Sequence, residues 1–149
     1  MTLKQKVYNC YNNLLEEKIK TLRNRIEDLS QDAQNDAKGS AGDKHETALA
    51  MMHLEQEKLS KQLKEVIAQK NILESINDTV INTNVGLGSL VYTDKFIFFI
   101  SIAMPKITLD NNDIVALSLD SPLGIAMKGK TSKEEFAFNN MKYEILKIE

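Results

Sequence analysis

A long row of apolar residues, spaced alternately four and three apart, restricts the first part of this chain to a coiled coil. Its members are Leu15, Ile19, Leu22, Ile26, Leu29 and Ala33. Such spacing places the side chains on one stripe of a helix, which is stable when a second helix covers it. We therefore predict a helix over residues 3–36. Leu3, Val7, Cys10 and Leu14 continue the pattern one residue out of phase, so we expect either a local adjustment of the helix there or a change of its packing partner near its base.

A second helix is predicted over residues 44–76. Apolar residues seven apart define its seam: Met52, Leu59, Val66, Leu73 and Val80. The other seam row contains Gln56, Lys70 and Asn77, which weaken it. Gly39 and Gly42 place the break between the helices at residues 37–42. The two segments then form an antiparallel hairpin whose arms are each about 50 Å long at 1.5 Å per residue.

Residues 79–149 lack the heptad pattern and instead contain short strand-like segments, which indicate a small sheet domain. Three segments have the composition of strands: Leu90–Tyr92, Phe96–Ile102 and Ile114–Leu119. Ser121 is a suitable N-cap and Pro122 a suitable first residue for a short helix, which Gly129 ends.

Two more strands, Glu134–Phe138 and Lys142–Ile148, flank a hairpin turn at Asn139-Asn140. We therefore predict an α+β protein. It has a coiled-coil hairpin at residues 1–78, followed at residues 79–149 by a small antiparallel sheet with one short helix.

Composition excludes several classes of protein. The net charge of −2 does not favour a general nucleic-acid binder. One cysteine fits a reducing compartment. The longest apolar stretch is shorter than the roughly 20 residues that span a bilayer. We expect a cytoplasmic protein without membrane contact.

The most informative motif is Asp43-Lys44-His45-Glu46, at the start of the second helix. An acid at the N-cap and Glu three residues later resemble a capping box, so the pair could serve only to cap the helix. Ser40 also precedes Asp43 at capping-box spacing. If Ser40 is the cap, both carboxylates are free on one face of the helix. Mg²⁺ is commonly bound by one or two carboxylates plus ligands from another molecule, which is the second interpretation.

Three segments resemble the Gre transcript-cleavage factors of bacterial RNA polymerase. The Gre tip reads Gly-Asp-x-x-Glu-Asn-Ala, and this chain has Gly42-Asp43-Lys44-His45-Glu46-Thr47-Ala48. The Gre Ser-Pro segment is matched by residues 120–130, beginning Asp120-Ser121-Pro122. The final Gre strand is matched by Tyr143-Glu144-Ile145-Leu146-Lys147-Ile148.

This resemblance implies an FKBP-like fold for the second domain and RNA polymerase as the partner. It further implies that the hairpin enters the secondary channel of the polymerase. There Asp43 and Glu46 would help to hold a Mg²⁺ shared with the polymerase and to activate water, so that the polymerase hydrolyses the 3′ end of backtracked RNA. On this interpretation the protein is not itself an enzyme. Docking would use Asp120, Ser121, Pro122 and Leu123.

Two other functions remain open at this point. The protein could occupy the channel without stimulating cleavage, because Thr47 replaces the Asn of the Gre motif. It could instead be a coiled-coil chaperone or scaffold with a capped turn. A basic cluster, Lys18, Lys20, Arg23 and Arg25, either faces RNA phosphates or forms an ordinary solvated helix face. We expect a monomer, although the seam could also pair between chains.

Overall fold

The computed structural model describes the backbone of residues 1–37 and 43–149, and side chains outside residues 36–45. The chain divides into two compact units. One is Asn13–Lys70, and the other combines Met1–Asn12 with Asn71–Glu149. These units differ from the predicted division at residue 78. The start of α1, up to Asn12, and the end of α2, from Asn71, belong with the sheet.

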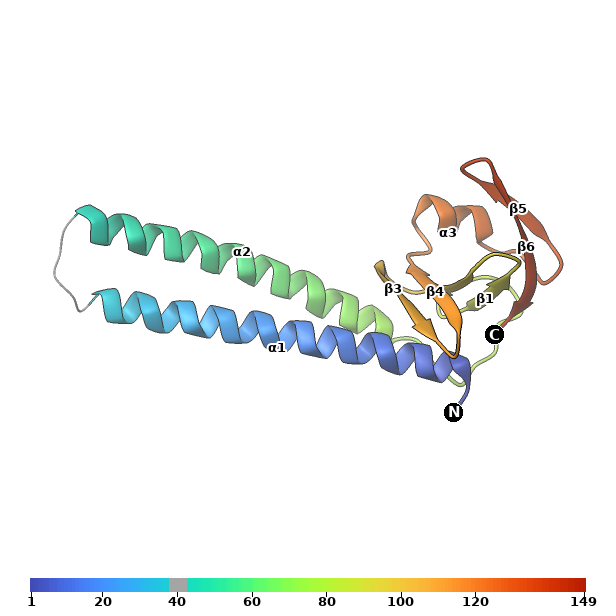
Figure 1. Ribbon diagram of the computed structural model, residues 1–149, viewed down its shortest axis with the longest axis horizontal. Helices are drawn as coiled ribbons and strands as arrows, with labels where there is room; N and C mark the ends of the chain where they lie inside the picture. Colours follow the sequence, from blue (N-terminus) through green and yellow to red (C-terminus); the bar gives the residue numbers. More distant parts are fainter. Residues whose placement is uncertain (38–42) are drawn as a thin grey trace. The chain divides into compact units, whose positions relative to one another are not determined.

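The unit Asn13–Lys70 is an antiparallel helical hairpin (Figure 1). Its helices are parts of α1 (Leu3–Ala37) and α2 (Asp43–Glu74). Ion pairs join Arg25 to Glu55 at 3.5 Å and Glu16 to Lys70 at 3.3 Å. The residue later in α1, Arg25, pairs with the residue earlier in α2, Glu55. This order confirms that the two helices run in opposite directions. The predicted seam residues Leu15, Ile19, Leu22, Leu59 and Val66 are buried.

In the second unit, the first turns of α1 pack with the sheet. Val7 and Tyr11 are fully buried. The Tyr11 ring stacks on Phe99 with centroids 6.1 Å apart, and its hydroxyl donates to the carbonyl of Pro105 at 3.1 Å. Burial raises the pKa of Tyr11 to about 12, so the hydroxyl stays protonated. Of the two alternatives expected near the base, the change of packing partner is the one observed, and the buried row contains Tyr11, while Leu14 is exposed.

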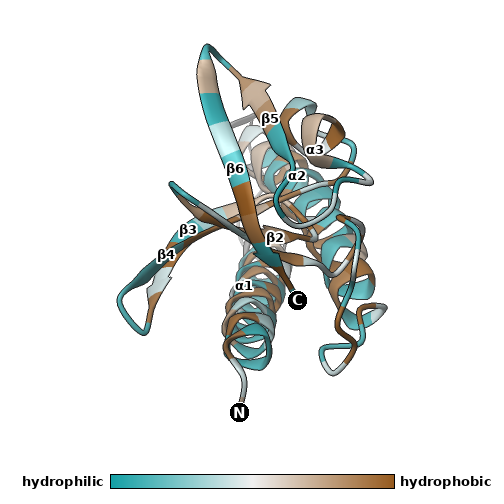
Figure 2. Cartoon of the chain, turned by 90° about the vertical axis from the view of Figure 1, so that its right-hand side faces the viewer, coloured by the Kyte–Doolittle hydropathy of each residue, from teal (hydrophilic) through white to brown (hydrophobic). Residues whose placement is uncertain are grey.

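Six strands form one sheet in the order β3-β4-β2-β1-β6-β5. Their bounds are β1 Leu90–Thr93, β2 Ile97–Ile100, β3 Met104–Leu109, β4 Asn112–Leu117, β5 Glu135–Phe138 and β6 Met141–Ile148. Figure 2 shows that the turns at the far ends of β3–β4 and β5–β6 are largely hydrophilic. Apolar residues are concentrated on the inner strands, and all four residues of β2 are buried.

The predicted α+β class is confirmed, but the sheet is mixed and not wholly antiparallel. β2 and β4 pair in parallel, with Ile97 opposite Ile114. After β2 the chain crosses to the edge as β3, so it returns as β4 in the direction of β2. The sequence prediction missed β3, which contains Pro105. Proline is tolerated there because β3 is an edge strand, where a missing N–H costs little.

Aromatic packing forms the core of the sheet unit. The Tyr143 ring contacts Phe98 edge-on at 5.8 Å and stacks on Phe136 at 5.0 Å between centroids. Helix α3 (Pro122–Met127) adds the fully buried Met127 to the same core. Asn139 and Asn140 both have positive φ, which confirms the predicted two-residue turn between β5 and β6.

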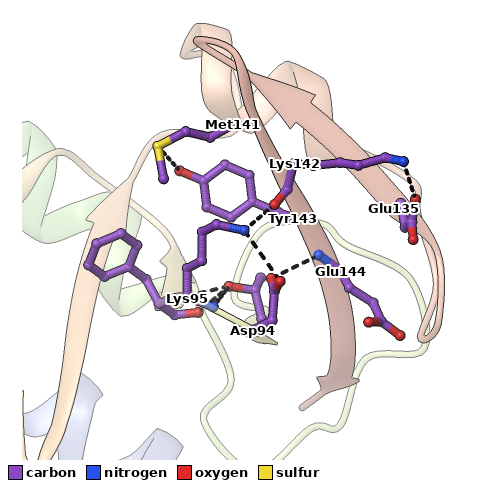
Figure 3. A network of polar contacts seen from close by, with 9 residues as sticks. Asp94, Lys95, Glu135, Met141, Lys142, Tyr143 and Glu144 are labelled. Atoms are coloured by element: carbon purple, nitrogen blue, oxygen red, sulfur yellow. Dashed lines mark hydrogen bonds and ion pairs between the residues drawn. The ribbon is translucent and has the colours of Figure 1, made fainter.

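Asp94 and Lys95, in the turn between β1 and β2, attach that turn to β6 (Figure 3). The Asp94 carboxylate accepts the N–H of Glu144 at 3.0 Å and pairs with Lys95 at 3.3 Å. The Lys95 ammonium donates to the carbonyl of Lys142 and lies 5.0 Å from the Tyr143 ring centroid. The N–H of Glu144, then Lys95, lowers the pKa of Asp94. The carboxylate therefore stays ionised and keeps the turn in place.

The close approach of α3 to the preceding loop predicts a large effect of Gly124→Ala. An added Cβ at Gly124 would lie 2.3 Å from the carbonyl oxygen of Ser118, which is backbone and cannot rotate away. We expect the free energy of unfolding to fall by about 1–3 kcal/mol, measured by urea denaturation. Gly86→Ala is the control, because a Cβ there meets nothing within 4 Å. Equal stability of the two variants would contradict this account.

Candidate functional site

The two acids of the tip motif belong to the first turn of α2. The helix begins at Asp43, and Glu46 is exposed three residues later. Residues three apart lie on the same face of a helix, so the backbone places these two positions together. The side chains of Asp43 and His45 lie outside the described residues, as do Ser40 and the predicted break at Gly39 and Gly42.

An acid in the first turn of a helix experiences the positive end of the helix dipole, which favours its charged form. The described side chains contain no group of three or more His, Cys, Asp or Glu that could hold a metal. Two carboxylates match the number that proteins commonly give to Mg²⁺. The residue types of the Asp43/Glu46 pair therefore fit Mg²⁺, which takes its remaining ligands from water or from other groups.

The predicted docking segment lies at the start of α3, where Ser121 is the N-cap. Its hydroxyl accepts the N–H of Gly124 at 3.1 Å and donates to the carbonyl of Ser118 at 2.7 Å. Pro122 occupies the first turn of the helix, as predicted, and Gly129 follows the helix end with φ +77°. Ser121 is thus engaged within its own domain.

The remaining residues of this segment divide into a buried and an exposed group. Leu123 packs half-buried against the core of the sheet unit. Asp120 and Pro122 are exposed. Ile125, which the sequence prediction missed, is 63% exposed. It follows Pro122 by three residues and so shares its face of α3. The opposite face of α3, with Gly124 and Met127, is buried, and nothing in the Ser-Pro motif itself points to Ile125.

The four residues of the predicted basic cluster on α1 do not form one patch. Lys18, Lys20, Arg23 and Arg25 are all exposed. At about 100° per residue, Lys18 and Arg25 share one face, whereas Lys20 and Arg23 lie roughly opposite. Arg25 also pairs with Glu55. These four residues are close together in the sequence, but the helix places them on different faces.

None of the helices in the described part of the chain is both long enough and apolar enough to span a membrane.

The N-cap geometry predicts that Ser121→Ala lowers the stability of the sheet unit. The change removes the acceptor for Gly124 N–H and the donor to Ser118, and loss of an N-cap typically costs about 0.5–2 kcal/mol. Ser121→Thr retains the hydroxyl and should lose much less. Urea denaturation of both variants measures the difference. If alanine and threonine destabilise equally, the hydroxyl contacts do not carry the effect.

Comparison with known proteins found few similarities. No family model matches the sequence, and no curated protein matches it. Among solved structures, the chain is similar to the crystal structure of GreA factor homolog 1 (Gfh1) protein of Thermus thermophilus. That likeness has 15% sequence identity and a TM-score of 0.35, and covers 93% of this chain and 94% of that chain.

Proposed function

We propose that this protein is a Gre-like transcription elongation factor. It binds RNA polymerase, inserts the tip of its hairpin into the secondary channel and stimulates cleavage of backtracked RNA. The observation that most supports this proposal is the secondary structure in which each of the three Gre-like segments lies. Asp43 and Glu46 are in the first turn of α2, Ser121-Pro122 begins α3, and Tyr143-Glu144-Ile145 lies in β6. Each segment has the secondary structure that its role requires.

The hairpin is long and narrow. The stretch of α2 from Asp43 to Lys70 is helical throughout, which corresponds to about 40 Å at 1.5 Å per residue. A two-helix hairpin is also narrow, about two helix diameters of roughly 10 Å each. Such a hairpin holds the acids at the start of α2 far from its own base, which suits entry into a channel.

The role of the tip acids follows from the chemistry of phosphodiester hydrolysis. Asp43 and Glu46 would hold a Mg²⁺ together with ligands from the polymerase. Bound there, the ion supplies charge neutralisation and an activated water for in-line displacement. The chain itself contributes two negative charges on one helix face and the rigid helix that positions them. Hydrolysis remains the activity of the polymerase.

Docking on the polymerase would use the exposed face of α3. Asp120, Pro122 and Ile125 are available to a partner, whereas Ser121 and Leu123 hold α3 in place. An apolar centre beside a charged rim is the usual composition of a protein interface. We assign the contact to Pro122 and Ile125, with Asp120 at their side.

A second candidate is a regulator that occupies the channel without stimulating cleavage. It is favoured by the position of Asp43 as the first residue of α2, where an acid can serve as a helix cap. In that case the acids stabilise the helix and contribute nothing to the reaction.

The two candidates are separated by Asp43→Asn combined with Glu46→Gln. These amides keep the size of both side chains, and Asn is a good N-cap, but they remove the charges that Mg²⁺ requires. We expect the double variant to lose stimulation of RNA cleavage in a backtracked elongation complex by about a hundredfold or more, while its affinity for the polymerase is nearly unchanged.

Asp28→Ala combined with Asp32→Ala is the matched control, because both are exposed acids on α1 of the same hairpin. It should retain cleavage. Wild-type binding without any stimulation of cleavage would favour the channel regulator. If the folded protein neither binds the polymerase nor stimulates cleavage, the chaperone or scaffold interpretation is the one that remains.

The α3 surface predicts that Pro122→Ala and Ile125→Ala each weaken binding to RNA polymerase. We expect Ile125→Ala to raise the Kd about tenfold, since an apolar side chain buried at an interface contributes roughly 1–2 kcal/mol. Leu146→Ala is the control, because Leu146 is 53% exposed on β6 of the same unit. Binding is measured with fluorescently labelled protein. An effect of Leu146→Ala equal to that of Ile125→Ala would contradict a specific α3 contact.

A further inference from the structure

The packing of the hairpin seam changes along its length. From Leu15 to Leu22 on α1, and at Leu59 and Val66 on α2, the seam residues are at most 8% exposed. Nearer the tip Ala33 is buried, whereas the larger seam residues Ile26, Leu29, Leu49 and Met52 are only half-buried. We call residues 15–22 and 59–69 the basal segment and residues 26–35 and 46–56 the distal segment. The distal segment has less apolar burial to hold it closed.

Two hollows mark the transition between these segments. One, of about 650 Å³, is bordered by Ile26 on α1 and by His53, Gln56 and Lys64 on α2. The other, of about 270 Å³, is bordered by Ala33 on α1 and again by His53 and Gln56. Both hollows are open to solvent, so they are grooves at the surface of the hairpin beside Gln56 and not voids within the seam.

Gln56 occupies a seam position and interrupts the apolar row. Its amide donates to the backbone carbonyl of Ile26 at 3.5 Å, which is long for a hydrogen bond. The adjacent ion pair, Arg25 with Glu55, is 57% and 38% exposed at its two side chains, and exposed pairs contribute little. A polar side chain in a coiled-coil seam fixes the alignment of the helices but lowers stability.

We propose that the distal segment opens locally while the basal segment stays closed, with Gln56 setting the boundary. Segments with few buried apolar contacts open at lower free energy than the whole protein. Glu46 lies within the distal segment, so each opening changes the position of Glu46 relative to α1. The hairpin is thus a conformational device whose tip geometry is adjustable. This inference goes beyond the proposed function and does not require a polymerase.

Hydrogen exchange of the full chain, read amide by amide by NMR, tests the proposal. Distal amides should exchange at least about tenfold faster than basal amides. Gln56→Leu replaces the polar seam residue by an apolar one of similar size and should slow distal exchange about tenfold, with basal exchange unchanged. Gln62→Leu makes the same chemical change at an exposed position of α2 and should leave both rates unchanged.

Equal exchange rates in the two segments of the wild-type protein would overturn the proposal. So would a Gln56→Leu protein whose distal rates match those of the wild type. Gln56→Ala provides a second test if the leucine variant associates through its extended apolar seam, as sedimentation would reveal. The alanine variant removes the side-chain contacts of Gln56 and should speed distal exchange several-fold. Unchanged distal exchange in this variant would also overturn the proposal.

Discussion

Burial of one apolar row on α1 is the constraint on which the structure depends. A helix of 35 residues exposes far more apolar surface than it can support alone, and isolated helices are marginal in water. Within the hairpin, α2 covers this row through Leu59 and Val66. Within the sheet unit, Phe99 covers its first turns by stacking on Tyr11. One helix therefore serves two cores, which explains why the compact units divide inside the helices.

The hairpin has no core apart from its seam, so the composition of the seam decides how rigid each part is. Leucine and valine close the basal segment, whereas Gln56 lies beside two surface hollows at the distal segment. A uniformly apolar seam would be more stable, but it would also specify the alignment of the helices less strictly. The seam thus combines a fully buried base with a half-buried distal segment, and Glu46 belongs to that distal segment.

Most elements could be predicted from the sequence because their signals are local. The heptad spacing identified α1 and α2, Ser121 and Pro122 identified α3, and Asn139-Asn140 identified the last hairpin. Strand β3 and the parallel β2–β4 pairing could not be predicted in this way. Pro105 argues against a strand when edge and central strands cannot be distinguished, and strand order depends on contacts between distant residues. The tip acids were predicted as a motif, but the arrangement of the Asp43 side chain lies outside the described residues.

The α3 segment shows why a motif and a binding surface are different things. Within a few residues, Ser121 caps the helix, Leu123 and Met127 pack on the core, and Gly124 allows the helix to approach the loop at Ser118. Only the side chains that these tasks leave exposed can contact another molecule. Ile125 is one of them, although nothing in the Ser-Pro motif points to it. A sequence motif of this kind preserves the shape of a helix, and the helix then decides which side chains reach a partner.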